Sequence, residues 1–206
     1  MANPWLNIPL ADYEGHMESP AVRQLHVLSE LFAEALAYCR PESIAVLGIA
    51  GGNGLEHVDW TITKRVIGLD VNPSYLEEVG SRYAASCELE LACVDLAEQR
   101  IELEPVQMVH AALVFEHAGA GLCLENALSL VAAGGNLSVV LQLPAEGGQN
   151  VGISPFPSMQ VLQPGFTLVD PEWLRRTLDQ RGLHLAHEAR RSLPAGKSFW
   201  MGVFRG

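Results

Sequence analysis

Residues 43–71 constrain the fold of this chain more than any other segment. An apolar run at 44–49 is followed by a glycine-rich turn, and a second apolar run at 66–69 ends in Asp70. A glycine turn leaves bare backbone for a ligand, and an acidic residue at the tip of the next strand can accept hydrogen bonds from two ribose hydroxyls. The segment therefore predicts half of a nucleotide-binding α/β unit.

The rest of the chain alternates between helical patterns and short apolar runs. The dipeptides Ser19-Pro20 and Asn72-Pro73 place proline after an N-cap residue, which marks the start of a helix. Uninterrupted apolar strands suit a parallel sheet that helices cover on both faces. We expect strands at 44–49, 65–70, 89–94, 106–114 and 136–143, and helices at 19–40, 54–61, 72–85, 121–131 and 170–181.

Two strand-like runs near the C-terminus, residues 183–190 and 198–204, complete the pattern. The link between them, 192–197, is too short for a helical crossover, so the two strands should pair antiparallel. The expected fold class is α/β: a Rossmann-like, mostly parallel sheet of seven strands with a C-terminal antiparallel hairpin, helices on both faces and the N-terminal helix as a cap. We expect Lys197, in the link, to be a solvated turn lysine.

Length and composition fit a single domain. The chain has 206 residues, 49% of them hydrophobic, which is enough to bury a core without disulfide staples. We expect residues 1–206 to form one domain, with 1–42 as an N-terminal cap segment and helix and 43–206 as the core. Residues 145–169 interrupt the pattern with prolines and glycines. Because so long a loop in a compact domain usually has a function, we expect a substrate-side insertion there.

Charge and cysteine content exclude several classes of protein. A net charge of −11 without a basic cluster would repel a phosphate backbone, so we expect no nucleic acid partner. No apolar run of about 18 residues and no signal peptide pattern is present, so we expect no membrane span and a cytoplasmic location. Without CxxC, HxxxH or HExxH spacing, we expect no metal site and reduced thiols at Cys39, Cys87, Cys93 and Cys123.

Several short motifs occur in an order typical of a known family. They read VLGIAGGNG at 46–54, GLDVN at 68–72, VDL at 94–96, LVFEHA at 113–118 and LSLVAAGGNLSVVLQLP at 128–144. Together they resemble the class I S-adenosylmethionine-dependent methyltransferases over roughly residues 43–205, and DYEGHMESPAV at 12–22 resembles a group of small bacterial proteins of this fold. The resemblance implies S-adenosyl-L-methionine as cofactor, a small-molecule methyl acceptor as partner, and a monomer or homodimer.

The resemblance also implies a role for each motif. Backbone N–H groups of the glycine turn would hold the methionine carboxylate. Asp70 would accept hydrogen bonds from both ribose hydroxyls, and Asp95 with the Leu96 N–H would contact the adenine. The chain departs from the family at Val46, where an acidic residue is common, and at Ala50, which replaces a glycine and should be tolerated if its φ is negative. The implied cofactor contacts are Gly48, Ala50, Gly51, Gly52, Asn53, Asp70, Val71, Asp95, Leu96, Phe115 and Glu116.

The chemistry that the resemblance implies requires little of the protein. A sulfonium makes its methyl group a good electrophile, so the protein need only align the nucleophile and exclude water. A general base is required only when the nucleophile arrives protonated, and the candidates are His16, Tyr13 and His117, for each of which an ordinary loop role is the alternative. Apolar residues at 155–159, with the net charge of −11, favour a neutral or cationic acceptor.

Two other functions stay open at this point. The absence of an acid at Val46 is compatible with a protein that binds S-adenosylmethionine or S-adenosylhomocysteine without turnover. An NAD-dependent oxidoreductase is a third possibility, although a GxGxxG fingerprint read from Gly48 or from Gly52 is incomplete. The oxidoreductase predicts a parallel sixth strand in place of the terminal hairpin.

Overall fold

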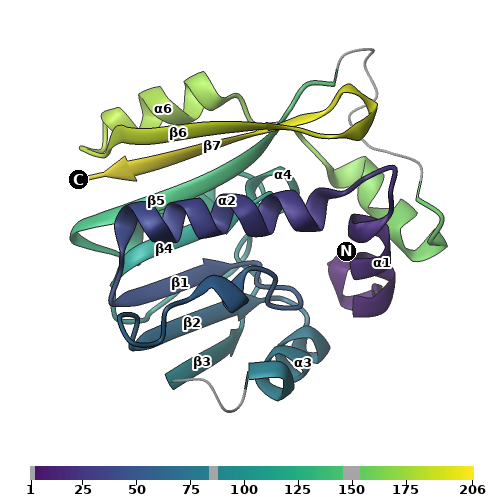
Figure 1. Ribbon diagram of the computed structural model, residues 1–206, viewed down its shortest axis with the longest axis horizontal. Coiled ribbons are helices and arrows are strands. Elements are labelled where there is room, and N and C mark those ends of the chain that lie inside the picture. The colour runs from purple at the N-terminus through teal and green to yellow at the C-terminus, as the bar shows by residue number, and fades with distance from the viewer. Residues whose placement is uncertain (1–2, 84–87, 146–153) are drawn as a thin grey trace.

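The computed structural model describes residues 3–83, 88–145 and 154–206, and within them seven strands form one sheet in the order β3-β2-β1-β4-β5-β7-β6 (Figure 1). Strands β1 to β5 run parallel, and β7 pairs antiparallel with both β5 and β6. The predicted fold class is confirmed, and the parallel sixth strand of the oxidoreductase alternative is contradicted. The strands are β1 Ser43–Leu47, β2 Arg65–Asp70, β3 Glu88–Cys93, β4 Val106–Ala112, β5 Val131–Leu143, β6 His184–Ser192 and β7 Ser198–Arg205.

Helices cover both faces of this sheet. Apolar side chains of α2 and α3 pack in one cluster, and those of α5 and α6 pack in a second cluster on the other face. In Figure 1, α2 lies across the front of the sheet and α1 lies beyond its right-hand edge. Among the described residues, no helix is long and apolar enough to cross a membrane. The α-helices are α1 Leu10–Glu18, α2 Gln24–Cys39, α3 Pro73–Tyr83, α4 Phe115–Ala118, α5 Leu122–Ser129 and α6 Pro171–Asp179, and the 3-10 helices are η1 Pro4–Asn7, η2 Leu55–His57, η3 Pro157–Gly165 and η4 Pro194–Gly196.

Strand β1 contributes side chains to both clusters. Ile44 and Val46 pack in the cluster of α2, whereas Ala45 and Leu47 pack in that of α5. Successive side chains of a strand project to opposite faces of the sheet, so each cluster receives every second residue. A strand that is buried on both faces must consist of apolar residues throughout, which is why its sequence could be recognised.

The carboxyl ends of the parallel strands meet at one edge of the molecule. Strand β7 starts at this same edge, because its first residue, Ser198, pairs with Leu143 at the end of β5. In Figure 1, α1, the green η3 segment and the yellow β6–β7 loop all gather at the right, where β1 ends. The sheet thus brings the ends of β1 to β5, the N-terminal segment and the hairpin loop close to one another.

The long N-terminal helix starts later than predicted. Ser19 does not cap it; instead Ser19 ends α1, and its hydroxyl donates to the carbonyl of His16 at 2.9 Å. Helix α2 begins at Gln24, after a turn in which Arg23 has a φ of 49°. Proline at position 20 cannot continue α1. The Ser-Pro signal therefore marks the end of one helix rather than the start of the next.

The helix predicted at 54–61 is reduced to the short η2. Gly52 and Gly54 have φ values of 81° and 92°, which no α-helix contains. The Gly54 N–H donates to the Glu56 carboxylate at 2.8 Å, so a side chain takes the place of a helical hydrogen bond.

Strand β5 starts at Val131, five residues before its predicted start at Asn136. The two glycines at 134 and 135 were predicted to end a helix. They lie instead within the strand, opposite a shift of register between Val106 and Met108 of β4, as in a β-bulge. Three predictions lie partly or wholly outside the described residues: the end of the helix at 72–85, Cys87, and positions 146–153 of the insertion at 145–169.

Gly54→Ala tests the packing of α2 against the turn after β1. An alanine Cβ would lie 2.5 Å from Cδ1 of Phe32, at a φ of 92°. Gly182 provides a matched control, because its φ is 81° but nothing lies within 4 Å of its added Cβ. We expect Gly182→Ala to lower the free energy of unfolding by about 1–2 kcal/mol, and Gly54→Ala by about 1–3 kcal/mol more, as measured by urea denaturation. Equal losses would mean that Phe32 moves aside without cost.

Candidate functional site

A cavity of about 710 Å³ opens at the carboxyl edge of the parallel strands. Ligands of open α/β sheets bind in this crevice, and the volume is within the range of small-molecule sites. Residues after β1 to β4, the N-terminal segment with α1, the η3 segment and the β6–β7 loop line it. Of the predicted site residues, the cavity wall contains Tyr13, His16, Gly48, Ala50, Asp70, Val71, Asp95, Leu96 and His117.

Asp70 ends β2 and is held by backbone groups on both sides. Its Oδ2 accepts from the Ala50 N–H and its Oδ1 from the Asn72 N–H, each at 2.9 Å. The side chain is buried, and this burial raises the pKa of Asp70 despite the N–H groups of Asn72 and Ala50, which lower it. Each carboxylate oxygen can accept more than one hydrogen bond. Asp70 is therefore fixed in place and still has capacity for ligand hydroxyls.

Ala50 adopts a left-handed conformation that the sequence did not predict. Its φ is +45°, so the negative φ at which alanine should be tolerated here is not adopted. A residue with a Cβ in this region costs about 1–2 kcal/mol. The hydrogen bond from the Ala50 N–H to Asp70 is made in this conformation and offsets part of that cost.

Three N–H groups of the glycine turn donate to acceptors within the protein. Gly48 donates to the Leu69 carbonyl at 2.8 Å, Gly52 donates to the Ile49 carbonyl at 2.9 Å, and Ala50 donates to Asp70. The turn was expected to hold a methionine carboxylate through these donors. In the structure the turn lines the cavity with the backbone of Gly48 and Ala50, and the three N–H groups of Gly48, Ala50 and Gly52 stabilise the turn itself.

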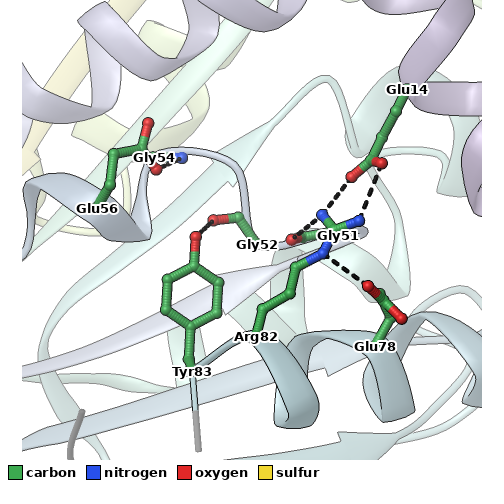
Figure 2. Close-up of polar contacts among 8 residues, drawn as sticks. All are labelled: Glu14, Gly51, Gly52, Gly54, Glu56, Glu78, Arg82 and Tyr83. Carbon is green, nitrogen blue, oxygen red and sulfur yellow. Dashed lines mark hydrogen bonds and ion pairs between the residues drawn. The ribbon is translucent and has the colours of Figure 1, made fainter. Parts of the chain in front are cut away.

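Gly51 and Gly52 face away from the cavity, toward α1 and α3 (Figure 2). The Arg82 guanidinium donates to the Gly51 carbonyl at 3.0 Å, and the Tyr83 hydroxyl donates to the Gly52 carbonyl at 3.1 Å. A Cβ on Gly52 would lie 2.8 Å from the ring of Tyr83. These glycines allow α3 to approach the turn closely.

Arg82 also connects the turn to α1. Figure 2 shows both of its terminal nitrogens directed at the Glu14 carboxylate and its Nε directed at Glu78. A two-pronged guanidinium–carboxylate contact fixes direction as well as distance. Through Glu14, the helix that carries Tyr13 and His16 is thereby tied to the back of the glycine turn.

Asn53 and Phe115 are likewise placed outside the cavity wall. The Asn53 side-chain amide donates to the Leu25 carbonyl at 2.9 Å, which ties the turn to α2. Phe115 is 1% exposed and packs in the apolar cluster of α5 and α6. Neither side chain reaches the lining, so any effect on a ligand would be indirect.

Asp95, after β3, is covered by the N-terminal segment. Its Oδ2 accepts from the Asn3 side-chain amide at 2.8 Å, and its Oδ1 accepts from the Ala97 N–H at 3.0 Å. Asn3 and Trp5 both line the cavity, although the sequence analysis did not select them. Asn3 and Asp95 are ninety-two positions apart in the sequence, so no local sequence pattern predicts their contact.

The N-terminal segment is fastened to the start of α3. The Asn72 side-chain amide donates to the Trp5 carbonyl at 3.0 Å, and the buried Tyr75 hydroxyl donates to the Ile8 carbonyl at 2.9 Å. Segment 3–18 therefore forms a wall of the cavity that is bonded to the sheet side. Within the cap segment predicted at 1–42, residues of η1 and α1 line the cavity, together with Gln24 at the start of α2.

All three candidate bases line the cavity. Burial lowers the pKa of His117 to about 4, and burial together with the nearby Lys197 lowers the pKa of His16, so both imidazoles are neutral at pH 7. Burial, reinforced by the carboxylates of Asp70 and Glu14, raises the pKa of Tyr13. The histidines can therefore accept a proton, whereas Tyr13 is a hydrogen-bond donor. The His117 ring meets Trp5 and Phe166 edge to face, with centroids 4.9 and 5.3 Å apart.

Glu116 lies behind the cavity rather than in its wall. It is 1% exposed, its Oε1 accepts from the Gln142 N–H at 2.8 Å, and its Oε2 has no hydrogen-bond partner among the described residues. Burial raises the pKa of Glu116 to about 7, although backbone N–H groups oppose the shift. A protonated carboxyl is the form that such an environment favours.

Further residues in the cavity wall were missed by the sequence analysis. They include Gln24, Gln142 and Lys197. Lys197 was predicted to be a solvated turn lysine, but it is partly buried in this wall. Among the described residues, no group of histidine, cysteine and acidic side chains is suited to hold a metal ion. Cys39, Cys93 and Cys123 are free thiols.

Glu116→Gln tests the burial of an ionisable group. The pKa of Glu116 is about 7 in the folded protein and about 4.3 in an unfolded chain. Its contribution to stability is therefore complete below pH 4 and is lost as the pH rises to 7. Between pH 4.5 and 7.5 the variant should gain up to about 3 kcal/mol relative to the wild type, as measured by urea denaturation. Histidine titration affects both proteins and cancels. A pH-independent difference would contradict the raised pKa.

Comparisons with known proteins identify the fold. No protein-family model matches the sequence, and no curated protein matches it. ChlM, the magnesium protoporphyrin IX methyltransferase of Synechocystis, solved with bound S-adenosylhomocysteine, has a TM-score of 0.73 at 13% identity and covers 98% of this chain and 97% of that one. NodS, an N-methyltransferase of Bradyrhizobium japonicum, has a TM-score of 0.64 at 15% identity, over 92% of this chain and 98% of that one. The cyclase SpnF has a TM-score of 0.65 at 13% identity, over 87% and 79%. This chain therefore has the fold of the class I S-adenosylmethionine-dependent methyltransferases.

Proposed function

We propose that the protein is an S-adenosylmethionine-dependent methyltransferase that acts on a small molecule. The observation that carries the proposal is the placement of Asp70. Its carboxylate ends β2 in the cavity wall and is oriented by N–H groups from both sides. A carboxylate fixed beside a backbone-lined turn suits a ligand that carries a ribose diol next to a flexible chain.

The remaining wall residues indicate how the cofactor would be oriented in the cavity. The ribose would be held by Asp70 and Val71, the adenine by Asp95 and Leu96, and the methionine end would pass the bare backbone at Gly48. At Gly48, an added Cβ would meet only Val114, at 3.4 Å. The other predicted contacts act by holding this wall in place: Ala50 through Asp70, and Gly51, Gly52, Asn53, Phe115 and Glu116 from behind it.

The chemistry follows from what the cavity supplies. When bound, the cofactor provides a methyl group on a sulfonium, which a nucleophile attacks in line. The protein positions that nucleophile and keeps water out. Trp5 from the N-terminal segment and Met159, Leu162 and Phe166 from η3 and its end form apolar parts of the wall. For an acceptor that arrives protonated, the neutral imidazole of His117, held between Trp5 and Phe166, is the group placed to accept the proton.

A second candidate function is binding of the cofactor without turnover. Val46, at the position where the family often has an acid, is 8% exposed and packs in the cluster of α2. No acidic side chain from β1 therefore reaches the cavity. A protein that binds the cofactor but transfers nothing would show the same cofactor affinity and no methylated product.

The first test is thermal unfolding with S-adenosylmethionine, S-adenosylhomocysteine and NAD. At a hundredfold excess over Kd, a ligand adds about 2.7 kcal/mol, or about 5–10 °C in Tm. We expect this shift with both adenosyl compounds and none with NAD. Asp70→Asn should lose most of it. Asp59→Asn serves as the control, because Asp59 is not among the cavity-lining residues and its carboxylate accepts hydrogen bonds from the N–H and hydroxyl of Thr61 in its own turn.

Each protein is compared with its own ligand-free Tm, since Asp70→Asn also weakens the turn. A wild type that shows no shift with either adenosyl compound would overturn the proposal. Where both compounds bind, transfer of a labelled methyl group to a panel of small acceptors separates an enzyme from a protein that only binds the cofactor.

A further inference from the structure

Lys197, in the cavity wall, is a cation without a charged partner among the residues that the structure describes. The chain has a net charge of −11, and no other lysine or arginine is found among the described residues that line the cavity. No described residue forms an ion pair or a side-chain hydrogen bond with the Lys197 ammonium. Burial lowers the pKa of Lys197, as expected for a charge that lacks a partner. A bound anion would supply that partner.

The hairpin holds Lys197 in a defined place. Ser192 and Ser198 pair across it, and the Leu193 N–H donates to the Lys197 carbonyl at 2.8 Å. Leu193 is 7% exposed and packs in the cluster of α2. The backbone of Lys197 is thus anchored on both sides, so its ammonium group is presented to the cavity from a rigid element.

His16 lies close enough to Lys197 to be affected by its charge, which contributes to the lowered pKa of His16. The Nδ1 of His16 is buried and has no hydrogen-bond partner among the described residues. A neutral imidazole has one N–H to donate and one nitrogen to accept. The two side chains face the same part of the cavity, and both lack partners there.

We propose that Lys197, assisted by His16, binds a carboxylate on the methyl acceptor, so that the substrate class is a small carboxylic acid with an apolar body. This inference rests on the proposed methyltransferase function. The wall around the pair supplies the apolar surface, from Met17, Met159, Leu162 and Phe166. The sequence predicted a neutral or cationic acceptor because the chain has a net charge of −11. A partly buried ammonium at contact distance outweighs surface charges that solvent screens.

Within the sheet, Lys197 lies apart from the end of β2, where the cofactor site is proposed. Asp70 ends β2 and Lys197 precedes β7, four strand positions away in the sheet; at about 4.8 Å per strand this is about 19 Å. From the ribose to the methionine carboxylate, an extended chain of seven bonds of about 1.5 Å reaches only about 10 Å. The Lys197 side chain and a hydrogen bond at each end of the cofactor can span the rest of this distance, so strand spacing alone does not assign the anion. We assign it to the second substrate, and the affinity for S-adenosylhomocysteine tests that assignment.

The experiment measures the affinity of three carboxylates and their neutral amides: benzoate and benzamide, phenylacetate and phenylacetamide, octanoate and octanamide. Calorimetry at pH 7 is run with and without saturating S-adenosylhomocysteine. In the wild type, at least one carboxylate should bind about 10- to 100-fold more tightly than its amide, as for a hydrogen bond to a charged group. The preference should disappear in Lys197→Gln and persist in Lys197→Arg. The chain's other lysine gives the control, Lys64→Gln.

The affinity for S-adenosylhomocysteine separates the two possible sources of the anion. It should stay within about twofold of wild type in Lys197→Gln. A tenfold loss would assign Lys197 to the cofactor carboxylate and overturn the proposal. So would a wild type that prefers no carboxylate, or a preference that survives in Lys197→Gln. Failure to bind S-adenosylhomocysteine at all would instead contradict the proposed function, while the carboxylate series without it still reports on Lys197.

A labelling measurement covers the case of an unstable variant. Lys64 and Lys197 are the only lysines of the chain, so acetylation of each can be followed by mass spectrometry in the wild type. The tightest carboxylate should slow acetylation of Lys197 at least tenfold and leave Lys64 unchanged. Equal rates with and without the carboxylate would contradict the proposal.

Discussion

The hydrogen bond from the Ala50 N–H to Asp70 connects the parts of the molecule on which the cavity depends. It closes the turn after β1 onto the tip of β2. The second oxygen of the same carboxylate holds the Asn72 N–H, and the Asn72 side chain holds the Trp5 carbonyl. A single buried carboxylate thus fixes two strand ends, the start of α3 and the N-terminal segment. These donors offset part of its desolvation, since the pKa of Asp70 stays raised, and they hold the carboxylate in position.

The same bond changes the meaning of the glycine-rich turn. Bare backbone at such a turn is usually interpreted as space for a ligand. Here that applies to Gly48 alone, since Gly51 and Gly52 make room for the side chains of α1 and α3, and Gly54 makes room for Phe32. Glycines in one motif therefore serve two purposes. Gly51, Gly52 and Gly54 allow neighbouring side chains to pack against the turn, and Gly48 leaves backbone without a side chain at the cavity. Only the structure separates the two.

The sequence predicted the sheet well because its signals are local. Buried strands such as β1 are apolar throughout, and the link before Lys197 is too short for a helix, so topology followed from a few segments. Features that depend on distant contacts were not predicted. Among them are the contacts of Arg82 and Asn72 that hold the N-terminal cap in place. Another is the left-handed conformation of Ala50, which depends on Asp70. Likewise, nothing near Lys197 in the sequence indicates that its hairpin leans over the cavity.

The cavity wall includes two separate parts of the fold, the ends of the first strands and the β6–β7 loop. The surfaces assigned to the cofactor belong to the ends of β1, β2 and β3, whereas Lys197 belongs to a loop at the other side of the sheet. A change of length or charge between β6 and β7 therefore alters what is recognised without disturbing the carboxylate at β2. Grafting this loop from other proteins of the same fold is a direct route to engineering acceptor choice while the cofactor site is retained.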